Sequence, residues 1–224
     1  RNGTQNAVWD PVSFVGDNGV VFSTPVTRSA WTLVYEDSIG EYSDSLAQVG
    51  WNLGRAFGTE VGLRPFGGTG IGTNNDLGNA SNVGYVPPLS QAWNKYDAAT
   101  PLDYSANPPA RVVIAMGQND GSAGASNSTT IAAMVTVVNG IRAMIGTLVP
   151  IHFCIPWSGN SRSAITAGVA QIRTAGDTKV FLIDSGTDTL GATYGSQSAT
   201  TVDGVHPNFP YGNITFVTPL AYRI

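Results

Sequence analysis

The sequence predicts a three-layer α/β/α sandwich around a central five-stranded parallel sheet. Three observations predict it: five short apolar runs rich in β-branched residues, segments of helical periodicity between them, and Gly, Pro or polar clusters at the boundaries. Parallel strands need long crossover connections, and crossover helices cover both faces of the sheet. The alternation of strands and helices therefore indicates the fold class.

The five apolar runs are short and continuous, as in strands buried on both faces. They occupy 31–37 (WTLVYED), 59–66 (TEVGLRPF), 111–117 (RVVIAMG), 149–155 (VPIHFCI) and 178–184 (TKVFLID).

Helical spacing of apolar residues predicts helices between these strands. The spacing covers 43–57 through Leu46, Val49, Leu53 and Phe57, 128–148 through Ile131, Met134, Val135, Val138, Ile141 and Ile145, and a third helix through Ile165, Val169 and Ile172. A closing helix at 212–224 places Ile214, Val217, Ala221 and Ile224 on one face. Ser43 and either Ser128 or Thr129 are the expected N-caps.

Two regions fall outside the alternation. Residues 1–30 are β-prone and form an N-terminal arm or linker, so the expected domain is 31–224. Residues 73–110 form a long segment rich in Asn, Pro and Gly, and a loop of that length in a compact domain is usually functional.

Composition narrows the class of protein. Of the 224 residues 42% are hydrophobic, and we expect no membrane span because no apolar run approaches the roughly 18 residues required. Charged residues make up 12% and the net charge is -4, which disfavours a nucleic-acid partner. The low-charge, hydroxyl-rich surface favours a secreted or extracytoplasmic protein. Cys154, the single cysteine, excludes an internal disulfide and is interpreted as a buried, inert thiol.

Ser38 stands where the first strand stops. Ligands of open parallel sheets bind beyond the carboxyl ends of the strands, where a serine ahead of a helix can expose its hydroxyl. The alternative is an ordinary turn in which Asp37 and Ser38 only cap the helix.

A serine nucleophile needs a base, usually a histidine oriented by a carboxylate. His206 lies in a polar loop, DGVHPN, three residues after Asp203, and the alternative for it is a solvated loop histidine. His152 lies within a predicted core strand and is interpreted as structural.

Two further strand ends offer donors for an oxyanion. The glycines of GGTGIG (67–72) allow close approach of backbone N–H groups, and Thr73 stands where a dinucleotide fingerprint needs a third glycine. In GQND (117–120), Asn119 is either an oxyanion donor or a turn asparagine.

In combination, EDSI, GGTGIG, GQND and DGVHPN resemble the four ordered blocks of the SGNH hydrolases, also called the GDSL esterase/lipase family. The resemblance implies a serine esterase with Ser38 as nucleophile, Asp203 and His206 completing the triad, and Ser38, Gly70 and Asn119 forming the oxyanion hole. Glu36 departs from the glycine usual in the first block, and Thr69 from the serine common in the second.

The substrate is expected to be a short-chain acyl ester, above all an acetyl group on a small-molecule or polysaccharide substrate. The second block resembles that of the family's carbohydrate O-acetyl esterases, and Tyr85, Trp93 and Trp157 could stack on sugars, although loop aromatics more often serve packing. A lipase or thioesterase and a non-catalytic carbohydrate-binding module remain the alternatives. No cofactor or metal is expected, since DSGTD (184–188) lacks the ligand count for calcium. The oligomeric state stays open.

Overall fold

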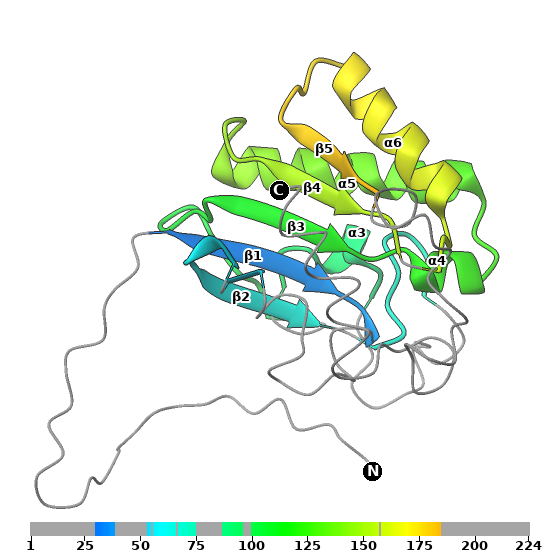
Figure 1. The fold of residues 1–224 in the computed structure, drawn as a ribbon, viewed down its shortest axis with the longest axis horizontal. Coiled ribbons are helices and arrows are strands. Elements are labelled where there is room, and N and C mark those ends of the chain that lie inside the picture. Colours follow the sequence, from blue (N-terminus) through cyan, green and yellow to red (C-terminus); the bar gives the residue numbers. More distant parts are fainter. Residues whose placement is uncertain are drawn as a thin grey trace, which may run out of the picture.

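The computed structural model contains one parallel sheet whose strand order differs from the chain order. It describes residues 30–38, 53–54, 56–65, 67–74, 87–95, 100–156 and 158–184. Five strands pair in parallel in the order β2-β1-β3-β4-β5 (Figure 1). Their bounds are Trp31–Glu36 (β1), Glu60–Pro65 (β2), Arg111–Ala115 (β3), Ile151–Cys154 (β4) and Val180–Ile183 (β5). All five predicted strands are confirmed, and the sheet is parallel as predicted.

One face of the sheet is covered by helices α5 (Asn127–Ile145) and α6 (Arg162–Thr174), which pack against each other (Figure 1). Their buried side chains, including Met134, Val138 and Ile165, join the inward residues of the strands in the larger core cluster. Both helices were predicted from their apolar periodicity. Within the described part of the chain, α5 is also the one helix long and apolar enough to be considered for a membrane span, by length and composition only. Its apolar side packs on the sheet, as in the core helix of a globular domain.

The opposite face carries a smaller cluster of Val34, Leu53, Val113, Cys154 and Ile183. Leu53 and Phe57 belong to the predicted helix 43–57, of which Leu53, Gly54, Ala56 and Phe57 are described and helical. The guanidinium of Arg111 lies 4.0 Å from the centroid of the Phe57 ring, a cation–π contact. The rest of that helix, the predicted closing helix 212–224 and the arm 1–29 lie outside the described residues.

Two local predictions need correction. The N-cap of α5 is Ser126 rather than Ser128 or Thr129: its backbone is extended, and its hydroxyl accepts a 3.1 Å hydrogen bond from Thr129 N. The segment 73–110 is also not a continuous loop, because it contains the short helix α3 (Leu89–Ala92). Its buried Leu89 and Ala92 anchor that segment to the core. A second short helix, α4 (Gln118–Ser122), follows β3 and was not predicted.

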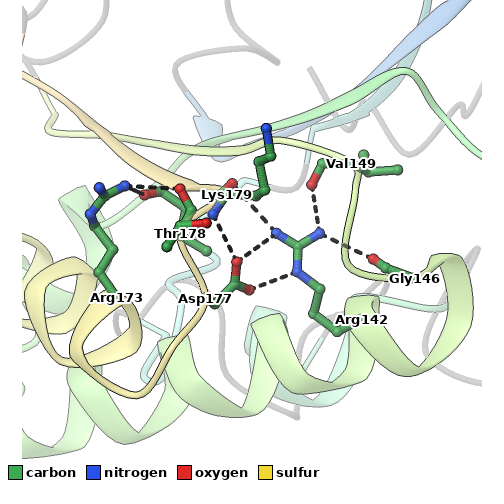
Figure 2. A network of polar contacts seen from close by, with 8 residues as sticks. Arg142, Gly146, Val149, Arg173, Asp177, Thr178 and Lys179 are labelled. Atoms are coloured by element: carbon green, nitrogen blue, oxygen red, sulfur yellow. Dashed lines mark hydrogen bonds and ion pairs between the residues drawn. The ribbon is translucent and has the colours of Figure 1, made fainter.

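A polar network holds the amino-terminal edge of the sheet, where β4 and β5 begin (Figure 2). Arg142 of α5 donates to Asp177 Oδ2 over 2.7 Å and to the backbone carbonyls of Val149 and Gly146 over 2.5 and 3.2 Å. Asp177 also accepts a 3.0 Å bond from Lys179 N. These contacts tie α5 to the connections that enter β4 and β5, at the edge opposite the strand ends that carry Ser38 and Asn119.

Candidate active site

The sheet order brings three of the sequence blocks to one edge. Glu36, the last residue of β1, is paired with Pro65 of β2 on one side and with Ala115 of β3 on the other. Parallel strands have their carboxyl ends at the same edge. Ser38, two residues beyond Glu36, therefore lies between the segment that follows β2 and the segment that follows β3. Ser38 is partly exposed and has helical backbone conformation.

The segment after β3 holds the segment after β2 in place. The side-chain amide of Asn119 donates a 3.0 Å hydrogen bond to the carbonyl oxygen of Thr69. The carboxylate of the neighbouring Asp120 accepts from three consecutive backbone N–H groups: Ile71 at 2.6 Å, Gly72 at 2.8 Å and Thr73 at 3.1 Å. The residues on both sides of Gly70 are thus bonded to two adjacent side chains of α4.

Asp120 is a site residue that the sequence reasoning missed. It is fully buried, and burial raises its pKa above the usual value although the backbone hydrogen bonds act in the opposite direction. The signal was present in the sequence, because an acidic residue in a predicted turn directly after a strand often caps backbone N–H groups. Which N–H groups it binds, about 48 residues away, became visible only in the folded chain.

Position 70 has room for glycine alone. A Cβ added there would stand 2.5 Å from Asp120 Oδ2 and closer still to the Thr73 carbonyl oxygen. The Gly70 N–H, one of the proposed oxyanion donors, donates a 3.1 Å hydrogen bond to Asn74 Oδ1. A substrate oxygen that binds this N–H must therefore replace the amide oxygen of Asn74.

The loop between β4 and α6 docks on α4. Ser161 Oγ donates to the Gly117 carbonyl over 2.8 Å, and Ser158 Oγ donates to Gln118 Oε1. Gly117 has a φ of 125°, which favours glycine at this turn. Asn160 also donates to the Gln118 carbonyl over 3.3 Å. The loop on which Trp157 was predicted as a substrate contact is thus fastened beside Asn119, while Trp157 itself is outside the described part.

Glu36, which stands where the first SGNH block usually has glycine, is buried inside the fold. Side chains alternate along a strand, so Glu36 shares the face of Val34 and Cys154, and it is 1% exposed. Burial raises the pKa of the Cys154 thiol strongly, and the charge of Glu36 raises it further. Cys154 is therefore the buried, unreactive thiol that the sequence predicted.

His152 is a core residue on β4, as predicted. Its ring stacks on Phe181 of β5 with centroids 5.2 Å apart and is 6% exposed. Burial, together with the positive charge of Arg111, lowers the pKa of His152 to about 4. The imidazole is thus neutral at ordinary pH and lies in the sheet rather than at its carboxyl edge.

The remaining predicted site residues fall into two groups. Asp203, His206, Tyr85 and Trp157 lie outside the described residues. Trp93 is described, and its indole packs so closely on Gly140 of α5 that a Cβ there would meet the ring at 2.5 Å. Its carbonyl accepts a 2.5 Å bond from the Tyr35 hydroxyl. These are packing contacts of a partly buried side chain, and the substrate contact of Trp93 stays a prediction. Among the described residues no three His, Cys, Asp or Glu side chains are grouped to hold a metal ion.

Solved structures share this fold, although no family model and no curated protein match the sequence. A family two carbohydrate esterase from Clostridium thermocellum, in complex with cellohexaose, has a TM-score of 0.72 at 17% identity over 91% of this chain and 66% of that chain. Est2A, an acetyl xylan esterase from the rumen bacterium Butyrivibrio proteoclasticus, has a TM-score of 0.67 at 16% identity over 90% and 64%. A protein assigned to the G-D-S-L lipolytic family from Desulfitobacterium hafniense has a TM-score of 0.58 at 12% identity over 87% and 99%.

These comparisons establish the class of fold. The chain has the three-layer α/β/α fold of the SGNH hydrolases and resembles their carbohydrate esterases, as the four sequence blocks predicted. It spans less than two thirds of the length of each of the two carbohydrate esterases. Because the sequence identities are below 20%, the comparisons show the fold alone. The chemistry must be argued from the residues of this chain.

Proposed function

We propose that the protein is a serine esterase that removes short acyl groups, acetyl above all, from a carbohydrate. The observation that carries the proposal is the placement of Ser38 between Gly70 and Asn119 at one sheet edge, with the two flanking segments bonded to each other. In this proposal Ser38 is the nucleophile, His206 the general base and Asp203 the carboxylate that orients it.

The reaction would be acyl transfer to water. Ser38 Oγ attacks the ester carbonyl while His206 takes the hydroxyl proton, and the resulting oxyanion is held by the N–H groups of Ser38 and Gly70 and the Asn119 amide. Collapse expels the alcohol, protonated by His206, and leaves an acyl-enzyme. Water activated by the same imidazole then releases the acid and regenerates Ser38.

The preference for a carbohydrate ester is supported by what similar folds do. One neighbour is a family two carbohydrate esterase in complex with cellohexaose and another is an acetyl xylan esterase. Tyr85, Trp93 and Trp157 remain the proposed stacking residues. The loop 158–161, which is hydrogen-bonded to Gly117 and Gln118, would form one wall of the substrate site beside Asn119. The low-charge composition supports a secreted protein.

The test is hydrolysis of 4-nitrophenyl acetate and of acetylated xylan by the purified protein. Ser38→Ala should abolish both activities, whereas Ser163→Ala, an exposed serine of α6, should change neither. Faster cleavage of long than of short acyl chains would favour a lipase or thioesterase. Equal rates for wild type and Ser38→Ala would overturn the enzyme proposal, and polysaccharide binding without hydrolysis would indicate a non-catalytic module.

A further inference from the structure

The buried carboxylate of Asp120 has no part in the acyl-transfer steps, yet it is bonded to the loop that carries an oxyanion donor. Its two oxygens accept from the N–H groups of Ile71, Gly72 and Thr73. We propose that Asp120 is the positioning residue of the oxyanion hole, which holds the Gly70 N–H at a fixed distance from the Asn119 amide. This inference rests on the proposed function and deepens it.

The geometry favours positioning over simple loop capping because the contacts bracket Gly70. The carbonyl before it, that of Thr69, is bonded to Asn119, and the N–H groups after it are bonded to Asp120. Asn119 and Asp120 are consecutive residues of α4, so one short piece of backbone sets both sides of the Gly70 peptide. A movement of α4 relative to β1 would shift both donors together.

A carboxylate suits this role better than an amide. Three N–H groups need three acceptor positions, which two carboxylate oxygens supply and a single amide oxygen does not. The negative charge also strengthens each bond, because hydrogen bonds to ionised acceptors are about twice as strong as neutral ones. An oxyanion hole works only if its donors stand in place before the charge develops, and misplacement by about 1 Å can reduce the rate about 100-fold.

The experiment compares Asp120→Asn with wild type on a short-chain ester and on the thionoester in which sulfur replaces the carbonyl oxygen. The variant keeps the shape of the side chain but turns one acceptor oxygen into an NH₂ group that opposes an N–H. We expect kcat for the ester to fall about 10- to 100-fold with KM little changed. The ester-to-thionoester rate ratio should fall as well. Misplaced N–H donors stabilise the transition state less, and this loss is larger for an oxygen anion than for a sulfur anion, which accepts weaker hydrogen bonds.

Asp177→Asn is the matched control. That carboxylate also accepts from a backbone N–H and from Arg142, but at the opposite edge of the sheet (Figure 2). It should lower the unfolding temperature while leaving kcat and the ester-to-thionoester ratio unchanged. If kcat and the ester-to-thionoester ratio fell as far in Asp177→Asn as in Asp120→Asn, the effect would be one of lowered stability. That result would overturn the inference.

A second pair of variants tests the loop without changing Asp120, so that a folding defect in Asp120→Asn does not decide the outcome. A Cβ on Gly72 would meet Ala133 Cβ at 2.9 Å and press the loop away from α5. Gly72→Ala should therefore lower kcat, and Gly72→Ala with Ala133→Gly should recover part of it.

The outcomes separate the two proposals. A wild type without ester hydrolysis would overturn the proposed function and this inference together. An active wild type, an inactive Ser38→Ala and an Asp120→Asn variant with unchanged kcat and rate ratio would overturn the positioning role alone. An unchanged kcat in Gly72→Ala would also count against that role.

Discussion

The side-chain amide of Asn119 lies 3.0 Å from the carbonyl oxygen of Thr69, a residue 50 positions earlier in the chain. This bond joins the segment after β3 to the segment after β2, and Ser38 follows β1, the strand that lies between β2 and β3. One N–H of the amide is used to hold the neighbouring loop, so the orientation of the side chain is set before substrate binds. The same residue is thereby a structural tie and a proposed oxyanion donor.

Asn119→Ala should reduce kcat for a short-chain ester about 100- to 1000-fold, the usual effect of losing one oxyanion donor. The unfolding free energy should fall less sharply, by about 1 to 3 kcal/mol, because the Thr69 carbonyl loses a buried partner. Steady-state kinetics and chemical denaturation would measure the two effects. Asn139→Ala, on the exposed side of α5, serves as control, and a loss of stability without a loss of kcat would contradict the prediction.

Asn74 should act as an internal competitor for the Gly70 N–H. Its amide oxygen accepts that N–H over 3.1 Å, and a net hydrogen bond contributes about 0.5 to 1.5 kcal/mol. Asn74→Ala should therefore raise kcat/KM about 2- to 10-fold. Asn74→Asp should lower it, because a charged acceptor binds the N–H more tightly. If Asn74→Ala instead lowers kcat/KM, the side chain orders the loop more than it competes with substrate.

His152 should make the protein less stable in acid. Its pKa is lowered to about 4 in the folded chain, against about 6.5 when unfolded, so between these values the unfolded chain binds a proton that the folded chain does not. The stabilisation is complete above pH 6.5 and is lost as the pH falls toward 4. Between pH 7 and 4.5, the unfolding free energy should drop by about 2 to 3 kcal/mol more in wild type than in His152→Phe or His152→Gln. Urea denaturation at both pH values would measure it, and equal drops would refute the assignment.

Arg142 should contribute to stability without contributing to activity. It is largely buried, pairs with Asp177 and donates to backbone carbonyls that enter β4 and β5 (Figure 2). Arg142→Met should lower the unfolding free energy by about 2 to 4 kcal/mol, because it leaves a carboxylate and carbonyls without their donor.

Arg173→Met is the comparison for Arg142. Arg173 is exposed and donates hydrogen bonds to the carbonyls of Thr178 and Val180. Arg173→Met should therefore lower the unfolding free energy by less than about 1.5 kcal/mol. Equal losses in the two variants would show that burial does not set the difference. Neither change should alter kcat, since both residues stand away from the carboxyl ends of the strands.

Much of the fold was predictable because its signals are local. Each strand is a short apolar run between chain breakers, and α5 and α6 show the helical spacing of buried residues. The cap of α5 was placed two or three residues too late because Ser126, Ser128 and Thr129 are close together and all carry hydroxyls. Only the extended backbone at Ser126 distinguishes the true cap.

The candidate site was predicted less completely. Ser38, Gly70 and Asn119 could be proposed because each follows a predicted strand, and strand ends of a parallel sheet meet at one edge. The packing contact of Trp93 was not predicted, because an aromatic residue in a polar segment gives no sign of which neighbour its ring packs against. In the structure Trp93 packs on Gly140 of α5, where a Cβ would stand 2.5 Å from the indole ring.

The sequence by itself determined the alternation of strands and helices, the parallel sheet and the strand-end positions of the candidate residues, since periodicity and chain breakers act over a few residues. Tertiary structure alone decided the strand order β2-β1-β3-β4-β5. It also decided the hydrogen bonds of Asp120 to the N–H groups of residues 71–73 and the burial of Glu36 beside Cys154. Hydrophobic patterns specify that a face is buried but not which segment buries it. That choice depends on contacts between residues tens of positions apart, which form only when the whole core packs.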